Sequence, residues 1–206
     1  MKQPIDAFGH IVNFSHCSDS SLYTDEEFLF NVNTIFGLDE INTPENRYIV
    51  NLLLEGEGST TEVMPYLSLM HIPGAERINT WVREECAKLY NVPVDKIKIS
   101  SSWMNRMYRG ARGRIHNHAG NEALGPNPTC IAIFYQNNPE NGSKLILMRT
   151  GKFGDYTHTY PEEDKIYVTP ETGDLVIHDP ELWHAISEHN SDEPRICFVY
   201  HLDLTS

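Results

Sequence analysis

The stretch that decides the fold is KIYVTPETGDLVIHDPELWHAISEHNSDEPRICFVYHL, residues 165–202. It contains short runs rich in β-branched and aromatic residues, separated by turn-forming residues, at 165–168, 174–178, 183–186 and 195–202. The segments between these runs lack the spacing of an amphipathic helix. The stretch therefore predicts short strands in close succession.

The residues before this stretch continue the same pattern. Further β-prone runs occur at 97–104, 112–118, 130–136 and 144–149. The dipeptide Asn141-Gly142 predicts a hairpin between the last two of these runs. About eight strands in roughly 110 residues, with no helix between them, favour a two-sheet jelly roll or a related barrel.

The N-terminal part of the chain has helical features instead. Apolar residues recur at steps of three and four between Ala75 and Tyr90, and Asn91 and Pro93 follow, so a helix is predicted there. An earlier helix start is predicted with Thr24 as its N-cap. We therefore expect an α+β protein of one domain, residues 1–206, in which a helical or irregular portion (1–95) packs on a jelly-roll core (96–206).

The charge balance limits the partners of this protein. Its 206 residues include 16 Lys and Arg against 29 Asp and Glu, giving a formal net charge of −13. Phosphates would meet net repulsion, so bulk binding of nucleic acid is excluded, although a local basic site is not. Arg106, Arg109, Arg112 and Arg114 form one basic run, either ordinary surface residues or a cluster that attracts an anionic substrate.

The compartment can also be predicted. The four cysteines form no C-x-x-C pair, and the neighbours of Cys130 and Cys197 are apolar, which is typical of small buried residues in a reducing compartment. No apolar run approaches ~18 residues, and the N-terminus lacks the apolar region of a signal peptide. We expect a cytoplasmic protein with no membrane partner.

Three histidines are candidates for metal binding. His116 and His118 end a predicted strand at alternate positions, so both rings lie on one face and can reach one ion. His184 begins a later strand, after a turn, a strand and a loop that return the chain to the same cavity. Histidine pairs are often only surface or hydrogen-bonded residues, so the metal prediction depends on all three together.

Arg195 opens the apolar strand that follows His184. If Cys197 and Val199 face inward, the period of two turns Arg195 inward as well. A buried arginine needs an anion, which is either an internal carboxylate or one brought by a ligand.

Residues from about 100 to 203 resemble Fe(II)- and 2-oxoglutarate-dependent oxygenases, particularly small prolyl-hydroxylase-like members from bacteria and viruses. The resemblance is carried by Ser102-Trp103-Met104-Asn105, His116-Asn117-His118, Tyr135 on an apolar strand, the Pro139–Ser143 turn, Gly173-Asp174-Leu175-Val176-Ile177, Trp183-His184 and Arg195-Ile196-Cys197-Phe198. It covers about half of the chain. The resemblance implies a double-stranded β-helix with iron inside.

The same resemblance implies the roles of the site residues. His116 and His184 would bind Fe(II), with His118 as an uncertain third ligand. The co-substrate 2-oxoglutarate would chelate the iron, and Arg195 would hold its distal carboxylate, with Tyr135 and Tyr108 as weaker candidates for a hydroxyl contact. The enzyme would use O2 to hydroxylate a small molecule or a protein side chain, releasing succinate and CO2, and no catalytic residue beyond the metal site is implied.

One position departs from the family pattern. Most of these enzymes have Asp or Glu two residues after the first histidine, where this chain has His118. Either His118 is the third ligand or a carboxylate such as Glu122 takes that place. The alternatives are a cupin-type metalloenzyme using His116, His118, Glu122 and His184, a three-histidine dioxygenase that does not use 2-oxoglutarate, and a non-enzymatic jelly-roll protein.

The other histidines are predicted to be ordinary. His178 points away from the face shared by Leu175 and Ile177, which favours a supporting or exposed position over metal binding. His158, His189 and His201 are interpreted as loop or C-terminal residues without a role at the site. The sequence contains no nucleophile elbow and no phosphate-binding loop, so it gives no indication of a nucleophilic enzyme.

Overall fold

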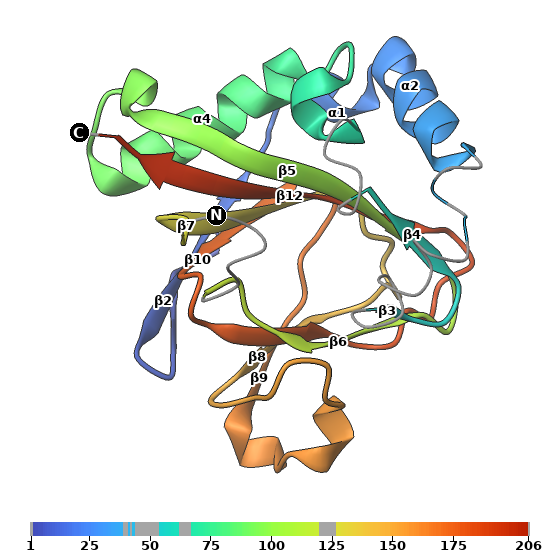
Figure 1. Cartoon of the computed structure of the whole chain (residues 1–206), viewed down its shortest axis with the longest axis vertical. Helices are drawn as coiled ribbons and strands as arrows, with labels where there is room; N and C mark the ends of the chain where they lie inside the picture. Colours follow the sequence, from blue (N-terminus) through green and yellow to red (C-terminus); the bar gives the residue numbers. More distant parts are fainter. Residues whose placement is uncertain are drawn as a thin grey trace.

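The fold, seen in a computed structural model, consists of two antiparallel sheets facing each other, with helices on the outside of the larger one (Figure 1). The structure describes residues 2–38, 41, 43, 54–61, 67–119 and 127–205. This is the predicted double-stranded β-helix with a helical portion packed on it, so the α+β prediction is confirmed.

The larger sheet contains strands from both the N-terminal and the C-terminal parts of the chain. Its strands, in spatial order, are β1 (Ile5–Ala7), β2 (His10–His16), β10 (Asp174–His178), β7 (Cys130–Asn137), β12 (Arg195–Leu204), β5 (Ile97–Met107) and β4 (Gly58–Thr60). The smaller sheet contains β3 (Leu54–Glu55), β6 (Arg112–His116), β11 (Trp183–Ile186), β8 (Leu145–Met148) and β9 (Lys165–Val168). Every strand run predicted from residue 97 onward is therefore present.

Among the described residues, three α-helices lie against the outer face of the larger sheet (Figure 1): α1 (Ser21–Thr24), α2 (Glu26–Phe36) and α4 (Glu76–Tyr90). Short 3-10 turns occur at Leu69–His71, Val94–Lys96, Thr157–Thr159 and Glu162–Asp164. The predicted helix from Ala75 to Tyr90 is confirmed as α4, which ends at Asn91 in the left-handed conformation.

Side chains along β7 and β12 point alternately to the two faces of the larger sheet, and they contribute to a separate hydrophobic core on each face. Phe134 and Phe198 face the helices, where Phe134 meets the ring of Trp81 at 5.7 Å and Phe198 meets that of Phe28 at 5.6 Å. Ile133 and Val199, one residue away on the same strands, belong to the core between the two sheets. The second core leads to the cavity described below.

Two local predictions are wrong. Asp25, not Thr24, caps the early helix, because the Asp25 side chain accepts a hydrogen bond from the backbone N–H of Phe28, whereas Thr24 closes the preceding turn. Asn141-Gly142 does not form a hairpin, because β7 pairs with β10 and β12 while β8 pairs with β9 and β11. The turn instead carries the chain from one sheet to the other.

The part of the chain before residue 96 contributes more sheet than the sequence indicated. β2 pairs with β10, and the short strands β3 and β4 pair with β6 and β5. Residues 58–60 extend the larger sheet along β5. Within the described residues, no helix is both long and apolar enough to cross a membrane.

Candidate metal centre

Adjacent strands of the smaller sheet bring the candidate histidines together. His116 ends β6 and lies directly opposite His184 on β11, with the two ring centres 4.3 Å apart. His118 lies two residues beyond His116, where its backbone N–H donates to the carbonyl of Pro180 at 2.9 Å. Each of the three rings offers one potential ligand nitrogen, and these three nitrogens lie within 4.8 Å of one another.

Hydrogen bonds at Nδ1 determine which nitrogen each ring offers. A carbonyl oxygen can only accept, so the Nδ1–H of His116 donates to Arg114 at 2.9 Å and the Nδ1–H of His184 donates to Leu182 at 3.0 Å. A neutral imidazole carries one N–H, and Nε2 of both rings therefore presents a lone pair. Nε2 of His118 lies 3.3 Å from Nε2 of His184.

Two further histidines adjoin this group. Nε2 of His201 lies 2.9 Å from Nδ1 of His118. The ring of His178 lies 4.9 Å from that of His184, and its Nδ1–H donates to the carbonyl of Asp179 at 2.7 Å. His178 lies on the opposite face from Leu175 and Ile177, as predicted, in a buried supporting position beside His184. The interpretation of His201 as an ordinary residue is wrong.

The imidazoles of this group are neutral at pH 7. Burial lowers the pKa of His116, and burial together with neighbouring imidazoles lowers the pKa of His118 and His184 well below its ordinary value. Burial also lowers the pKa of His178 and of His201 to about 4. Neutral imidazoles are the protonation state that a metal ion requires.

Arg195 is a buried cation without an acidic partner among the described residues. Its side chain lies in the core between the sheets, 1% exposed, where Nη1 approaches the sulfur of Met107 at 3.3 Å and the guanidinium carbon lies 5.0 Å from the ring centre of Tyr135. Its Nε has no hydrogen-bond partner in the part of the chain that is described. The predicted inward direction of Arg195 is confirmed.

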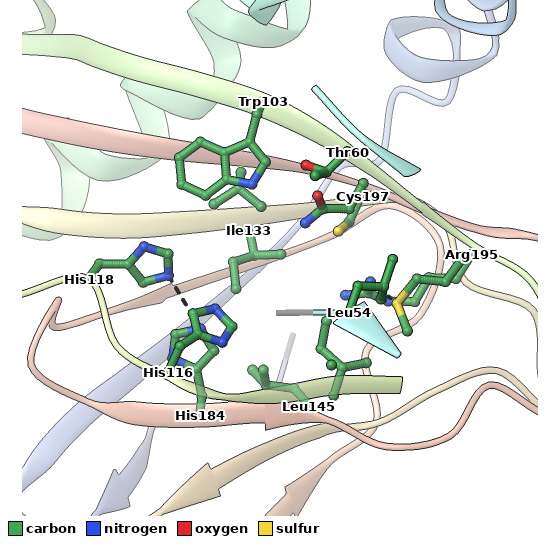
Figure 2. Close-up of a pocket in the computed structure, with 15 residues that line it drawn as sticks. Leu54, Thr60, Trp103, His116, His118, Ile133, Leu145, His184, Arg195 and Cys197 are labelled. Atoms are coloured by element: carbon green, nitrogen blue, oxygen red, sulfur yellow. Dashed lines mark hydrogen bonds between the residues drawn. The ribbon is translucent and has the colours of Figure 1, made fainter. Parts of the chain in front are cut away.

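The three histidines and Arg195 line one cavity between the sheets (Figure 2). The histidines lie at one end and Arg195 at the other. The remaining lining is mainly apolar, with Trp103, Ile133 and Leu145 among its side chains. The cavity therefore has potential metal-ligand nitrogens at one end and a cation at the other, with mainly apolar side chains between them.

The two tyrosines suggested by the resemblance lie in different places. Tyr135 is fully buried against Arg195, and its hydroxyl has no partner among the described residues. Burial raises the pKa of Tyr135 to about 12, so its hydroxyl keeps its proton and can donate. Tyr108 is not among the residues that line the cavity, and its ring stacks on Arg106 instead.

The basic run before the histidines lies outside the cavity lining. Arg109 pairs with Asp192 at 2.7 Å and Arg112 with Glu55 at 3.0 Å. Arg106 and Arg114 lie over the rings of Phe36 and Tyr156. These contacts favour the interpretation of Arg109 and Arg112 as ordinary surface residues, whereas Arg106 and Arg114 are half-buried against the rings. Glu122, the alternative carboxylate ligand, lies outside the described residues.

Comparison with known proteins finds one family that resembles the C-terminal half of this chain. A family described as "Putative 2OG-Fe(II) oxygenase" matches residues 101–201, which span the strands carrying the histidine group and Arg195. No curated protein matches at the sequence level. The matched residues make up just under half of the chain, and they bear out the resemblance to the 2OG-Fe(II) oxygenases.

Solved structures support the fold. The chain is similar to HygX from Streptomyces hygroscopicus with nickel, 2-oxoglutarate and hygromycin B bound, at 10% identity and a TM-score of 0.58, covering 97% of this chain and 84% of that one. It is also similar to the 2OG complex of a viral collagen prolyl hydroxylase from Paramecium Bursaria Chlorella virus-1, at 15% identity and a TM-score of 0.54, covering 93% and 94%.

A third structure is matched over less of its length. It is an oxidoreductase of the 2OG-Fe(II) oxygenase family from Burkholderia pseudomallei, at 13% identity and a TM-score of 0.49. The match covers 66% of this chain and 59% of that one.

Proposed function

We propose that this protein is an Fe(II)- and 2-oxoglutarate-dependent dioxygenase whose iron is held by His116, His118 and His184. The observation that carries the proposal is the shared cavity, in which converging imidazole nitrogens lie opposite a buried cation without an acidic partner among the described residues. Imidazole nitrogens suit Fe(II), and this donor set leaves coordination positions open. The residues present therefore fit the metal.

Arg195 is the proposed partner of the co-substrate. The keto-acid end of 2-oxoglutarate would chelate the iron, and the distal carboxylate would extend along the cavity to the guanidinium. A hydrogen bond between charged groups of this kind contributes about 1.5–3 kcal/mol. The Tyr135 hydroxyl, buried beside Arg195, is the second donor that we assign to the same carboxylate.

When bound, iron and 2-oxoglutarate supply the oxidising chemistry: one atom of O2 enters the substrate as a hydroxyl group, the other enters succinate, and CO2 leaves. The chain's own residues hold and orient these groups. Ile133 and Leu145 exclude water from the space between the metal ligands and Arg195. The substrate is a small molecule or a protein side chain.

His118 changes the charge of the proposed centre. Three neutral imidazoles leave it one unit more positive than two imidazoles and a carboxylate would. A dianion such as 2-oxoglutarate is attracted more strongly to such a centre, because the cavity lining is apolar and screens charge poorly. The local charge of the cavity is thus opposite to the net −13 of the chain.

The remaining assignments follow the same proposal. Residues 96–206 would form the catalytic core of one domain, with β3 and β4 adding Leu54 and Thr60 to the cavity lining. We place the enzyme in the reducing cytoplasm because its four cysteines are buried and free.

Anaerobic calorimetry tests the proposal. Fe(II) should bind the apoprotein at one site, and 2-oxoglutarate should bind the iron-loaded protein but only weakly, if at all, the apoprotein. A protein that binds iron but ignores 2-oxoglutarate would be a cupin-type enzyme or a three-histidine dioxygenase of another kind. Failure to bind any divalent metal would contradict both enzymatic interpretations.

A further inference from the structure

His201 lies directly behind the proposed metal centre, on β12. His201 is 3% exposed. The Nε2 atom of its ring lies 2.9 Å from Nδ1 of His118. The ring of Trp103 meets it edge-on at 4.9 Å and lies 5.8 Å from that of His118. His201 is therefore held in place, with one ring nitrogen aimed at one proposed ligand.

His118 differs from the other two proposed ligands in what fixes its N–H. Backbone carbonyls fix the N–H of His116 and of His184 at Nδ1, because a carbonyl cannot donate. The Nδ1 of His118 meets an imidazole nitrogen, which donates or accepts according to its own tautomer. Backbone carbonyls therefore determine which nitrogen of His116 and of His184 is free to bind a metal. For His118, the tautomer of His201 determines it.

Two arrangements of hydrogens satisfy these contacts. In the first, Nε2–H of His201 donates to His118, and Nε2–H of His118 donates to the lone pair of His184 across 3.3 Å. In the second, Nδ1–H of His118 donates to Nε2 of His201, and His201 carries its hydrogen at Nδ1. Only the second leaves a lone pair at Nε2 of His118, as metal binding requires.

We infer that His201 is a positioning residue that selects the metal-binding tautomer of His118 by accepting its Nδ1–H. Binding of the ion then shifts one hydrogen from Nε2 to Nδ1 on each of the two rings, with no net gain or loss of protons. The inference rests on the proposed function, since it assigns His201 a role toward the same metal.

Nitrogen NMR observes the tautomers directly. In protein labelled with 15N-histidine and saturated with Zn(II) as a diamagnetic probe, long-range proton–nitrogen correlations should show N–H at Nδ1 of both His118 and His201. The metal-free protein should show N–H at Nε2 of both rings. An Nε2–H on His201 in the zinc-loaded protein would overturn the inference.

Metal affinity in two variants provides a second test. Competition with a chromophoric chelator should show Zn(II) binding about 10–100-fold weaker in His201→Phe, the range for losing a partner of a metal ligand. His201→Gln, whose amide oxygen can accept the same hydrogen bond, should restore affinity to within a few-fold. A folded His201→Phe protein with unchanged affinity would contradict the inference.

Tyr200→Phe is the matched control. Tyr200 precedes His201 on β12 but belongs to the core that faces the helices, and its hydroxyl has no partner in the described part of the chain. The Tyr200→Phe protein should bind Zn(II) with the same affinity as the unaltered protein. If the unaltered protein binds neither Zn(II) nor Fe(II), the proposed function fails; if it binds both and His201→Phe has no effect, only the inference fails.

Discussion

Arg195 presents an energetic problem at the scale of a single residue. Removing a charge from water costs several kcal/mol unless a partner compensates it, and Arg195 is 1% exposed with no ion pair among the described residues. The buried guanidinium of Arg195 therefore destabilises the ligand-free protein. Its position is explained if an anionic ligand binds to it in the cavity. Arg195 should therefore lower the free energy of unfolding of the ligand-free protein but raise its affinity for the anion.

We predict that Arg195→Met separates these two effects. The free energy of unfolding, measured in urea with ligand-free protein, should stay the same or rise by about 1–4 kcal/mol, because an uncompensated buried charge is replaced by an apolar side chain. The affinity of the metal-loaded protein for 2-oxoglutarate, measured by calorimetry, should fall about 10–150-fold, which corresponds to a lost charged hydrogen bond of about 1.5–3 kcal/mol.

Arg149→Met is the control for this prediction. Arg149 is also an arginine, but it is exposed and pairs with Asp164 at 2.7 Å on the surface. Neither the co-substrate affinity nor the stability should change by more than about 1 kcal/mol in this variant. Unaltered 2-oxoglutarate binding by Arg195→Met would remove Arg195 from the proposed site.

The period of two explains which site residues could be predicted. It places His116 with His118, and Arg195 with Cys197, using neighbours in the sequence alone. It also places His201 on the face of Arg195, and this was the available signal for His201. Its contact with His118 could not be predicted, because that contact joins the two sheets and depends on how they pack.

At the scale of elements, Phe134 joins the helices to the larger sheet. Its ring is fully buried and meets Tyr23 at 5.6 Å, Trp81 at 5.7 Å and Phe198 at 6.1 Å. We predict that Phe134→Ala lowers the free energy of unfolding by about 3–5 kcal/mol, since it leaves a cavity between rigid elements. Urea denaturation followed by circular dichroism measures this loss.

Phe30→Ala serves as the comparison, because Phe30 lies on α2 but is 70% exposed. Its stability should change by no more than about 0.5 kcal/mol. Equal losses in the two variants would mean that α2 and α4 do not pack on the sheet as described.

Asp174 links β10 to the N-terminus and makes this contact sensitive to acid. Its burial opposes ionisation, but the backbone N–H of Glu171, with Lys2 and His16, outweighs burial and lowers the pKa of the carboxyl. A lowered folded-state pKa adds stability above the unfolded value, about 3.9, and this stability is lost as the pH falls through the folded value.

We therefore predict that Asp174→Asn lowers stability at pH 7 and removes part of its dependence on pH. The free energy of unfolding should decline less steeply below about pH 4 in the variant than in the unaltered protein. Urea titrations at a series of pH values measure both slopes. Parallel curves for the two proteins would show that this carboxyl does not titrate with folding.

Several elements could not be predicted because tertiary pairing, not local sequence, creates them. β3 and β4 are two and three residues long, too short for a periodic signal, and form only against β6 and β5. Asn141-Gly142 was misleading for a related reason: a turn signal predicts a reversal of the chain but not the sheet in which the next strand pairs.

At the scale of the whole molecule, the net charge and the site have opposite character. The chain carries −13, while the proposed centre combines a divalent ion, neutral imidazoles and Arg195. We predict no binding of duplex DNA at about 0.15 M salt, because the summed field repels phosphates. Fluorescence anisotropy of a labelled duplex measures this, and binding that weakens steeply with salt would refute it.

The composition of the chain predicts how it should behave toward distant partners, but it does not predict the chemistry of the cavity. Length and strand density were enough for one jelly-roll unit, since that fold requires only many short strands between turns. The sequence leaves the third ligand open between His118 and Glu122. His118 is the one that we propose, because it lies beside His116 and His184, while Glu122 lies outside the described residues. The substrate is not predicted, because loops define it.

The central claim is that the three histidines hold an iron that 2-oxoglutarate chelates, while Arg195 binds the distal carboxylate of 2-oxoglutarate. An anaerobic absorption titration tests it most directly. Apoprotein given Fe(II) and then 2-oxoglutarate should develop a visible charge-transfer band that requires both and is absent with succinate, which has no keto group. The band should need far more 2-oxoglutarate in Arg195→Met. An iron-loaded protein that develops no band at saturating 2-oxoglutarate would contradict the account.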